Sequence, residues 1–163
     1  MKFLLFLLLA CSLNIQATIF SSKAIVHPEV GKNGMVVSQH YLATNVGHSI
    51  LADGGNAYDA SIAVAFALAV VLPRAGNIGG GGFMVMFDEA SQESFSIDYR
   101  EMAPEAATKN MFLSSDGSVD KKRATQGILS IGVPGTVYGM WEVHKKFGSL
   151  PWSALLAPAI ELA

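Results

Sequence analysis

The sequence predicts a mixed α/β fold of the α+β kind, in which helices accompany a short antiparallel hairpin. Residues 62–72 are apolar without interruption and end at Pro73, which indicates a buried helix. Residues 83–98 instead form two strand-like runs on either side of a polar turn, which is typical of a hairpin. Because a two-stranded hairpin cannot cover such a helix, we expect a partner sheet from sequence that follows this chain.

Composition limits the class of protein. Of the 163 residues 51% are hydrophobic, and the formal net charge is −2, which supports one packed domain. Eleven Lys and Arg are balanced by thirteen Asp and Glu, so a nucleic-acid partner is not expected. The basic cluster at 121–123 is more typical of a solvated surface.

Residues 1–17 are typical of a secretory signal peptide. Lys2 precedes an apolar run over residues 3–10, and Ala17 offers a small residue for cleavage. The run is shorter than the roughly 20 apolar residues of a membrane-spanning helix, so no membrane span is expected. We therefore expect a mature chain of residues 18–163 in the periplasm or outside the cell. In the alternative, Cys11, the only cysteine, is lipidated as in a lipoprotein.

The first elements of the mature chain are a strand and two helices. Residues 34–38 read as a short β-branched strand, and helical apolar spacing follows over residues 41–53, closed by two glycines. Asn56 is a suitable N-cap for the next helix, and Asp59 can face the unpaired N–H groups of its first turn. That helix runs to about residue 72 and is apolar on all sides, so it should lie between a sheet and other helices.

The later elements are separated by turn residues. In order, we expect a strand at 83–87 buried on both faces, a turn at 88–93, a returning strand at 94–98, a partly helical surface segment at 103–125, a helix at 136–147 closed by Gly148, and a last helix that starts near Pro151 and is still running at Ala163. Because that last helix has no capping residue, the chain reads as the N-terminal piece of a longer protein.

Four successive glycines, Gly79, Gly80, Gly81 and Gly82, are the most informative local feature. Such a run implies either positive φ angles or a backbone that approaches something closely. A phosphate-binding loop runs from a strand through glycines into a helix, whereas these glycines follow a helix and lead into a strand. The sequence therefore favours a tight packing corner over a nucleotide site.

Few other side chains indicate chemistry. The histidines show no metal-ligand spacing, and Ser38 near His40 does not by itself make a catalytic pair. We expect the histidines to be surface or capping residues; they are His27, His40, His48 and His144.

Arg100 lies just after the second strand and allows two interpretations. It can form a local salt bridge with Asp98, or its planar guanidinium can bind a substrate carboxylate through two parallel hydrogen bonds. Chemistry alone favours neither. Glu101 is expected to orient the arginine rather than to act as an acid catalyst.

Four motifs together resemble one family. They are Asp-Gly-Gly-Asn-Ala-Tyr-Asp-Ala at 53–60, Ala-Gly-Asn-Ile-Gly-Gly-Gly-Gly-Phe-Met at 75–84, Asp-Tyr-Arg-Glu-Met-Ala-Pro at 98–104 and Val-Pro-Gly-Thr-Val at 133–137. From about Val26 to the last residue the chain resembles the N-terminal part of the large subunit of gamma-glutamyltransferases, also called gamma-glutamyltranspeptidases. The resemblance implies an N-terminal-nucleophile hydrolase fold, a four-layer αββα sandwich, of which this chain supplies helices and a hairpin.

The resemblance also implies an activity. Family members are zymogens that cleave themselves into large and small subunits, and they move a γ-glutamyl group from glutathione or related amides to water, an amino acid or a peptide. A threonine at the new N-terminus of the small subunit attacks the γ-carbonyl, and its own α-amino group is the base. No metal or organic cofactor is implied. The large-subunit arginine that grips the glutamyl α-carboxylate corresponds to Arg100.

The chain departs from the family because it carries no nucleophile. None of its threonines stands in the family's processing context, so these 163 residues alone should be inactive; they are Thr18, Thr44, Thr108, Thr125 and Thr136. Two alternatives stay open. One is a related acylase of the cephalosporin acylase type, and the other is a secreted module without catalysis.

Overall fold

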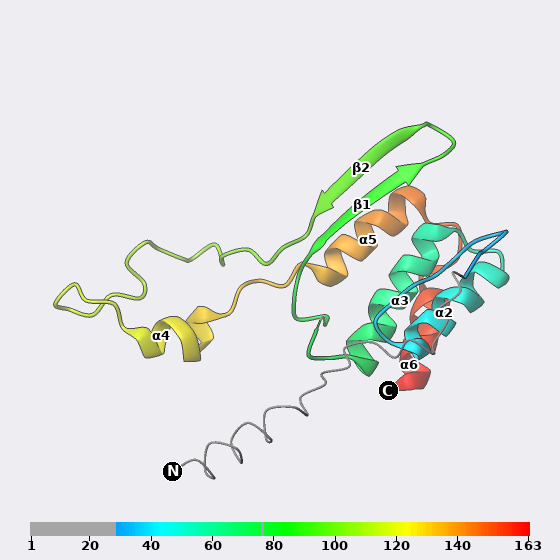
Figure 1. Cartoon of the computed structure of the whole chain (residues 1–163). Helices are drawn as coiled ribbons and strands as arrows, with labels where there is room; N and C mark the ends of the chain where they lie inside the picture. Colours follow the sequence, from blue (N-terminus) through cyan, green and yellow to red (C-terminus); the bar gives the residue numbers. More distant parts are fainter. Residues whose placement is uncertain (1–28, 76) are drawn as a thin grey trace, which may run out of the picture. The chain divides into compact units, whose positions relative to one another are not determined.

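The computed structural model describes residues 29–75 and 77–163, so the expected signal segment, Cys11 and His27 lie outside the described residues. Met1–Lys32 and Asn33–Ala163 form separate units, and every described helix and strand belongs to the second. In chain order these elements are α2 (Tyr41–Ala52), α3 (Ala57–Val71), β1 (Phe83–Asp88), β2 (Glu93–Asp98), α4 (Lys121–Gln126), the 3₁₀ turn η1 (Ile128–Ser130), α5 (Thr136–Phe147) and α6 (Trp152–Leu162) (Figure 1).

Local capping accounts for the ends of α2 and α3. The Nδ1 atom of His40 accepts a hydrogen bond from the Leu42 N–H (3.3 Å) and caps α2. Gly54, just after α2, has φ 91°, which a side chain rarely tolerates. Asn56 and Asp59 then form a capping box, so the predicted start of α3 is confirmed.

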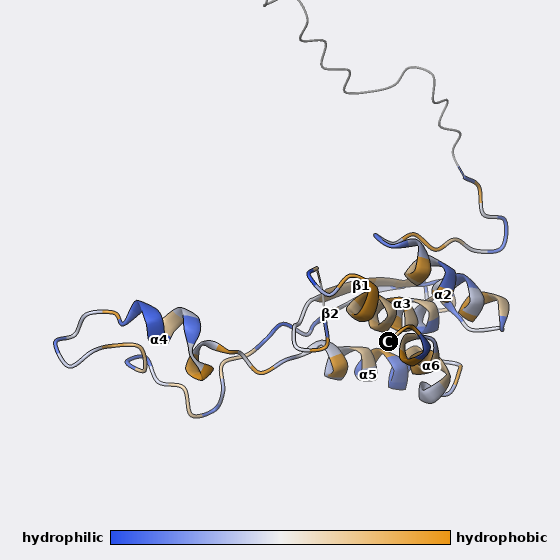
Figure 2. Ribbon diagram, turned by 90° about the horizontal axis from the view of Figure 1, so that it is seen from below, coloured by the Kyte–Doolittle hydropathy of each residue, from blue (hydrophilic) through white to orange (hydrophobic). Residues whose placement is uncertain are grey.

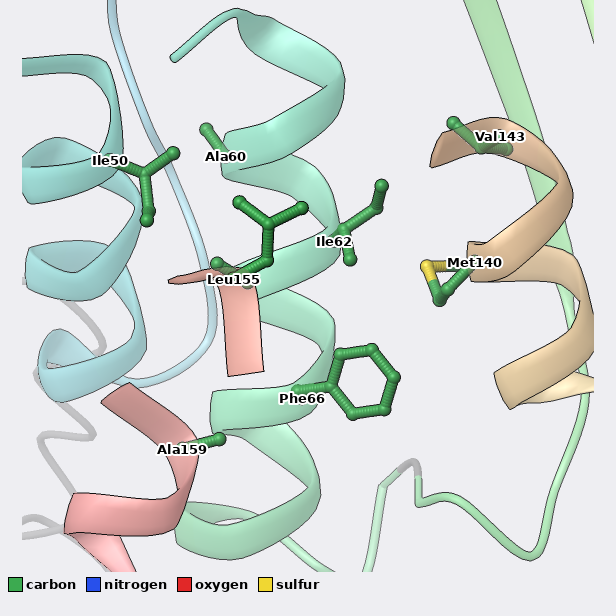
Figure 3. Close-up of a cluster of buried hydrophobic side chains, with 9 residues drawn as sticks. Ile50, Ala60, Ile62, Phe66, Met140, Val143, Leu155 and Ala159 are labelled. Atoms are coloured by element: carbon green, nitrogen blue, oxygen red, sulfur yellow. The ribbon is translucent and has the colours of Figure 1, made fainter. Parts of the chain in front are cut away.

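The described core is built around α3. This helix packs against α2, α5 and α6, and no residue from 62 to 72 is exposed. Ile62 and Phe66 project from α3 toward Met140 of α5, while Leu155 of α6 lies near Ile50 of α2 (Figure 3). Figure 2 shows mostly hydrophobic colouring where α3 lies between α2, α5 and α6. The prediction that this helix belongs to the core is therefore confirmed, but residues 64, 65 and 68–72 are only partly buried, and its main neighbours are helices rather than the hairpin.

The predicted hairpin is confirmed, but its predicted burial is not. Strands β1 and β2 pair antiparallel, with Phe83 opposite Asp98 and Asp88 opposite Glu93. Met84 and Met86 face the core, beside α5 (Figure 1), whereas Val85 between them is 82% exposed. The expectation that β1 is buried on both faces is wrong for the described chain, because no described segment covers the outer face.

The predicted strand at residues 34–38 is also wrong. The segment has no regular secondary structure and no paired strand among the described residues. Its Val36 side chain instead lies against α2: a Cβ added at Gly47 would be 2.7 Å from Val36 Cγ1 and 2.6 Å from Val64 Cγ2. Side-chain packing, rather than backbone pairing, holds this segment in place.

The remaining elements agree with the sequence. The expected surface segment carries an isolated bridge between Leu113 and Val119 around a turn in which Gly117 has φ 81°, followed by α4. Helix α5 ends at Gly148 as predicted, and α6 begins just after Pro151. Over residues 29–75 and 77–163, every helix is too short or too polar to cross a bilayer.

Candidate functional site

The glycine run, the end of the hairpin and the start of α5 meet at one corner of the described chain. Gly82 and Tyr99 exchange two backbone hydrogen bonds, of 2.9 and 3.4 Å, which continue the hairpin beyond β1 and β2. Met102 and Val133 exchange two more, of 2.8 and 3.2 Å. The backbone from 99 to 102 is thus held between two segments that are distant in sequence.

Close approach of backbone atoms explains Gly81, the glycine of the run with the least room for a side chain. The φ values of the run are not positive; in the described chain only Gly54 and Gly117 among glycines have that conformation. A Cβ added at Gly81 would instead lie 2.6 Å from the Tyr99 carbonyl oxygen, 2.7 Å from the Glu101 nitrogen and 2.8 Å from the Arg100 Cα. These are backbone atoms, which cannot rotate away. At Gly81 the backbone thus leaves no room for a Cβ, as expected for a packing corner.

The same corner supplies an acceptor to α5 rather than donors to an anion. The carbonyl oxygen of Gly80 accepts hydrogen bonds from the N–H groups of Gly135 (2.9 Å) and Thr136 (3.1 Å). These are N–H groups at the helix N-terminus that would otherwise lack partners, and α5 has no side-chain N-cap. A phosphate cradle needs free N–H groups, so this geometry does not suit one.

Tyr99 occupies the centre of the corner. Its half-buried ring lies 3.1–3.3 Å from the position that a Cβ of Gly82 would take, and a Cβ at Gly139 of α5 would overlap it. Its hydroxyl reaches the Phe83 carbonyl only at 3.5 Å. Burial raises the pKa of the Tyr99 phenol above its usual value, so the ring stays neutral at physiological pH.

Arg100 follows with an exposed side chain. Strand β2 ends at Asp98, whose Oδ1 accepts a hydrogen bond from the Arg100 backbone N–H (3.0 Å). No carboxylate of the described residues lies within 4.0 Å of the guanidinium. The salt bridge considered for Asp98 and Arg100 is therefore absent from this part of the chain, and the guanidinium is available to a ligand.

Glu101 does not orient Arg100 through an ion pair in the described residues, although the sequence suggested that it would orient the arginine. Its Cβ lies 2.9 Å from the position that a Cβ of Gly132 would take, so its side chain begins against the segment that leads into α5. Its carboxylate makes no ion pair with Arg100 in the described part of the chain. The structure thus holds Arg100 through the backbone and not through Glu101.

The histidine and serine candidates have structural contacts. Ser38 donates its hydroxyl to the His40 carbonyl oxygen (2.9 Å) while the His40 ring caps α2, so this pair has no nucleophile-and-base geometry. His144 shares a hydrogen bond between Nε2 and the Leu150 carbonyl oxygen (2.8 Å). Residues 29–75 and 77–163 contain no cluster of three or more metal-ligating side chains.

The sequence did not single out Tyr99 or Gly139 as parts of this site. They lie 40 residues apart in the numbering, and neither belongs to a periodic pattern that indicates contact. The sequence offered only an indirect signal for this part of the site. Gly135 lies in the Val-Pro-Gly-Thr motif, which belongs to the same family resemblance as the glycine run and Arg100.

Comparison with known proteins identifies the family. The sequence profile of gamma-glutamyltranspeptidase matches residues 43–163. The chain belongs to the gamma-glutamyltranspeptidase family. A glutathione hydrolase proenzyme from a Pseudomonas species is 49% identical over 163 residues, which are 99% of this chain and 27% of that protein. The crystal structure of Helicobacter pylori gamma-glutamyltranspeptidase matches with a TM-score of 0.78 and 50% identity, over 84% of this chain and 39% of that one.

The N-terminal-nucleophile hydrolase fold is shared more widely. A cephalosporin acylase from Bacillus halodurans matches with a TM-score of 0.68 and 30% identity, over 89% of this chain and 27% of that one. The predicted fold class, an incomplete sandwich of this kind, is confirmed. The chain corresponds to the N-terminal part of its gamma-glutamyltranspeptidase relatives and spans only 27% of the Pseudomonas proenzyme.

Proposed function

We propose that the full-length protein transfers a γ-glutamyl group from glutathione or a related γ-glutamyl amide to water, an amino acid or a peptide. A threonine hydroxyl outside this chain attacks the γ-carbonyl carbon, and its proton passes to the threonine's own α-amino group. The C–N bond then breaks, the amine leaves with that proton, and a γ-glutamyl ester remains. Attack by water or an acceptor amine on the ester releases the product and restores the threonine.

One observation about Arg100 carries the substrate assignment. Its guanidinium is exposed and free of carboxylate partners in the described chain, while its backbone is fixed between Gly81 and the segment before α5. An unpaired guanidinium on a fixed backbone suits the α-carboxylate of a glutamyl donor, which accepts two parallel hydrogen bonds from it. Arg100 is therefore the substrate-binding residue of this proposal.

The proposal extends to maturation and location. The full-length protein is a zymogen that cleaves itself, and the resulting small subunit is the partner that brings the nucleophile to this chain. Residues 1–17 direct export, which places the enzyme in the periplasm or outside the cell, with lipidation at Cys11 as the alternative. The 163 residues alone remain inactive.

Release of p-nitroaniline from γ-glutamyl-p-nitroanilide by the purified full-length gene product tests the activity. We expect release that requires self-cleavage and accelerates when an acceptor such as glycylglycine is added. A self-cleaved product that releases no p-nitroaniline contradicts the proposal.

An acylase acting on other amides is the second candidate, because a cephalosporin acylase shares the fold. The greater identity to the Helicobacter pylori gamma-glutamyltranspeptidase, 50% against 30%, favours the γ-glutamyl substrate. Comparing γ-glutamyl-p-nitroanilide with glutaryl-p-nitroanilide, which keeps the terminal carboxylate but lacks the α-amino group, separates the two.

A further inference from the structure

We propose that Tyr99 is the positioning residue that aims the Arg100 guanidinium, and that the glycines around it are there to admit its ring and backbone. This inference rests on the proposed function, since it assigns a role in binding the glutamyl α-carboxylate. Tyr99 acts through Arg100 and does not itself touch the substrate.

The Tyr99 ring is fixed by elements that come from different parts of the chain. On one side lies Gly82, where an added Cβ would be 3.1 Å from Cε2 and 3.3 Å from Cζ of the ring. On the other lies Gly139, where an added Cβ would overlap Cβ, Cγ and Cδ1 of Tyr99. Since Gly139 is buried within α5, an alanine there would suit the helix better; packing against the ring explains the glycine.

The backbone of Tyr99 is fixed as closely as its ring. A Cβ at Gly135 would overlap the Tyr99 carbonyl oxygen, and a Cβ at Gly81 would lie 2.6 Å from the same atom. The Tyr99 N–H also donates to the Gly82 carbonyl oxygen at 2.9 Å. The peptide that joins Tyr99 to Arg100 therefore has little room to rotate.

The Arg100 side chain, by contrast, has no anchor of its own. It is exposed and makes no ion pair in the described residues, so the position of its Cα sets the region that the guanidinium can reach. That Cα lies 2.8 Å from the position that a Cβ of Gly81 would take. Binding a carboxylate through two parallel hydrogen bonds is sensitive to the orientation of the guanidinium plane. Loss of the Tyr99 ring removes its packing against Gly82 and Gly139, which loosens this peptide and with it the orientation of the guanidinium.

Two donors that differ only in the α-carboxylate test the inference in the full-length, self-cleaved protein. They are γ-glutamyl-p-nitroanilide and 4-aminobutyryl-p-nitroanilide, and the measurement is the ratio of their kcat/KM values. We expect Tyr99→Ala to lower this ratio at least tenfold, mainly through KM for the glutamyl donor. Tyr99→Phe keeps the ring and should restore the ratio to within about threefold of the unmodified protein. Tyr138→Ala, which removes a 66% exposed tyrosine of α5, is the matched control and should leave the ratio unchanged.

Equal loss of kcat/KM for both donors in Tyr99→Ala would assign Tyr99 a general structural role and overturn the inference. If Tyr99→Ala does not mature, Tyr99→Leu, which keeps much of the apolar volume, is measured in its place. Failure of both to mature while Tyr99→Phe is normal assigns Tyr99 to folding and also overturns it.

Arg100→Ala separates this inference from the proposed function. If Arg100→Ala leaves the donor ratio unchanged, the proposed carboxylate contact itself is wrong, and the positioning role falls with it. If Arg100→Ala lowers the ratio and Tyr99→Ala does not, only the positioning role is wrong. In the double variant we expect no further drop beyond that of Arg100→Ala, because Tyr99 acts through the arginine.

Discussion

Asp59→Ala should release the loop between α5 and α6 from the start of α3. The Asp59 side chain is fully buried and accepts hydrogen bonds from the Asn56 N–H (3.1 Å), the Ser149 N–H (3.2 Å) and the Ser149 hydroxyl (2.5 Å). One carboxylate thus completes the capping box of α3 and ties it to a residue 90 positions later in the sequence.

The size of the effect follows from these contacts. A hydrogen bond to a charged group contributes about 1.5–3 kcal/mol, and loss of an N-cap interaction costs about 1 kcal/mol. Ser149 is exposed, so water can replace part of what its N–H and hydroxyl lose. We therefore expect the local free energy of opening to fall by about 2–3 kcal/mol. That corresponds to amide exchange about 30 to 150 times faster, since 1.4 kcal/mol is a factor of ten.

Hydrogen–deuterium exchange of the full-length protein, read by mass spectrometry, measures this change. The informative peptides cover residues 56–62 and 147–152. Asp53→Ala is the matched control: this carboxylate is exposed at the end of α2 and accepts no side-chain hydrogen bond in the described chain, so exchange should change less than about twofold. If Asp59→Ala exchanges no faster than Asp53→Ala, the contacts to Ser149 do not stabilise the loop and the reasoning is wrong.

Three further predictions concern Arg100, the glycine corner and the core. Arg100→Lys keeps the charge but loses the planar fork, so kcat/KM for γ-glutamyl-p-nitroanilide should fall at least tenfold, about 1.4 kcal/mol, with self-cleavage intact; an unchanged kcat/KM would remove Arg100 from substrate binding. Gly81→Ala should destabilise the protein by about 1–3 kcal/mol in thermal unfolding, because its Cβ meets backbone atoms. Gly80→Ala, whose Cβ comes no closer than 3.4 Å to its neighbours, is the control, and equal effects would contradict close approach as the reason for the glycine. Phe66→Asp places an unpaired charge in the core at a cost of several kcal/mol and should abolish maturation, seen as loss of self-cleaved protein on a gel; normal cleavage would show that this site is open to water.

Much of the fold could be predicted because its signals are local. The capping box at Asn56 and Asp59 spans four residues, and the two strand-like runs that predict the hairpin are separated only by a short turn. Burial was harder to predict. The outer face of β1 was expected to be covered because it is apolar, yet Val85 is exposed, since covering it needs a segment that the described chain does not supply.

In the candidate site, too, some residues could be predicted from the sequence and their contacts could not. The sequence motifs indicated Arg100 and the glycine run, because an arginine just after a strand and four glycines between a helix and a strand are unusual. The partners of Asp98 and Glu101 could not be predicted, because a carboxylate next to an arginine can equally accept a backbone N–H or turn away, and only the path of the chain decides which.

By itself, the sequence determined the helices, the hairpin, the family motifs and the likeness of residues 79–82 to a packing corner. Only the tertiary structure decided why residue 81 is a glycine: the backbone at Tyr99 and Arg100 passes too close to it for a Cβ, and no positive φ is involved. It also decided that the Arg100 side chain has no carboxylate partner in the described residues. The physical reason is the distance along the sequence over which each kind of interaction acts. Caps and periodic patterns act within a few residues, whereas this corner joins Gly80 to Gly135 and Thr136, more than fifty positions later in the sequence.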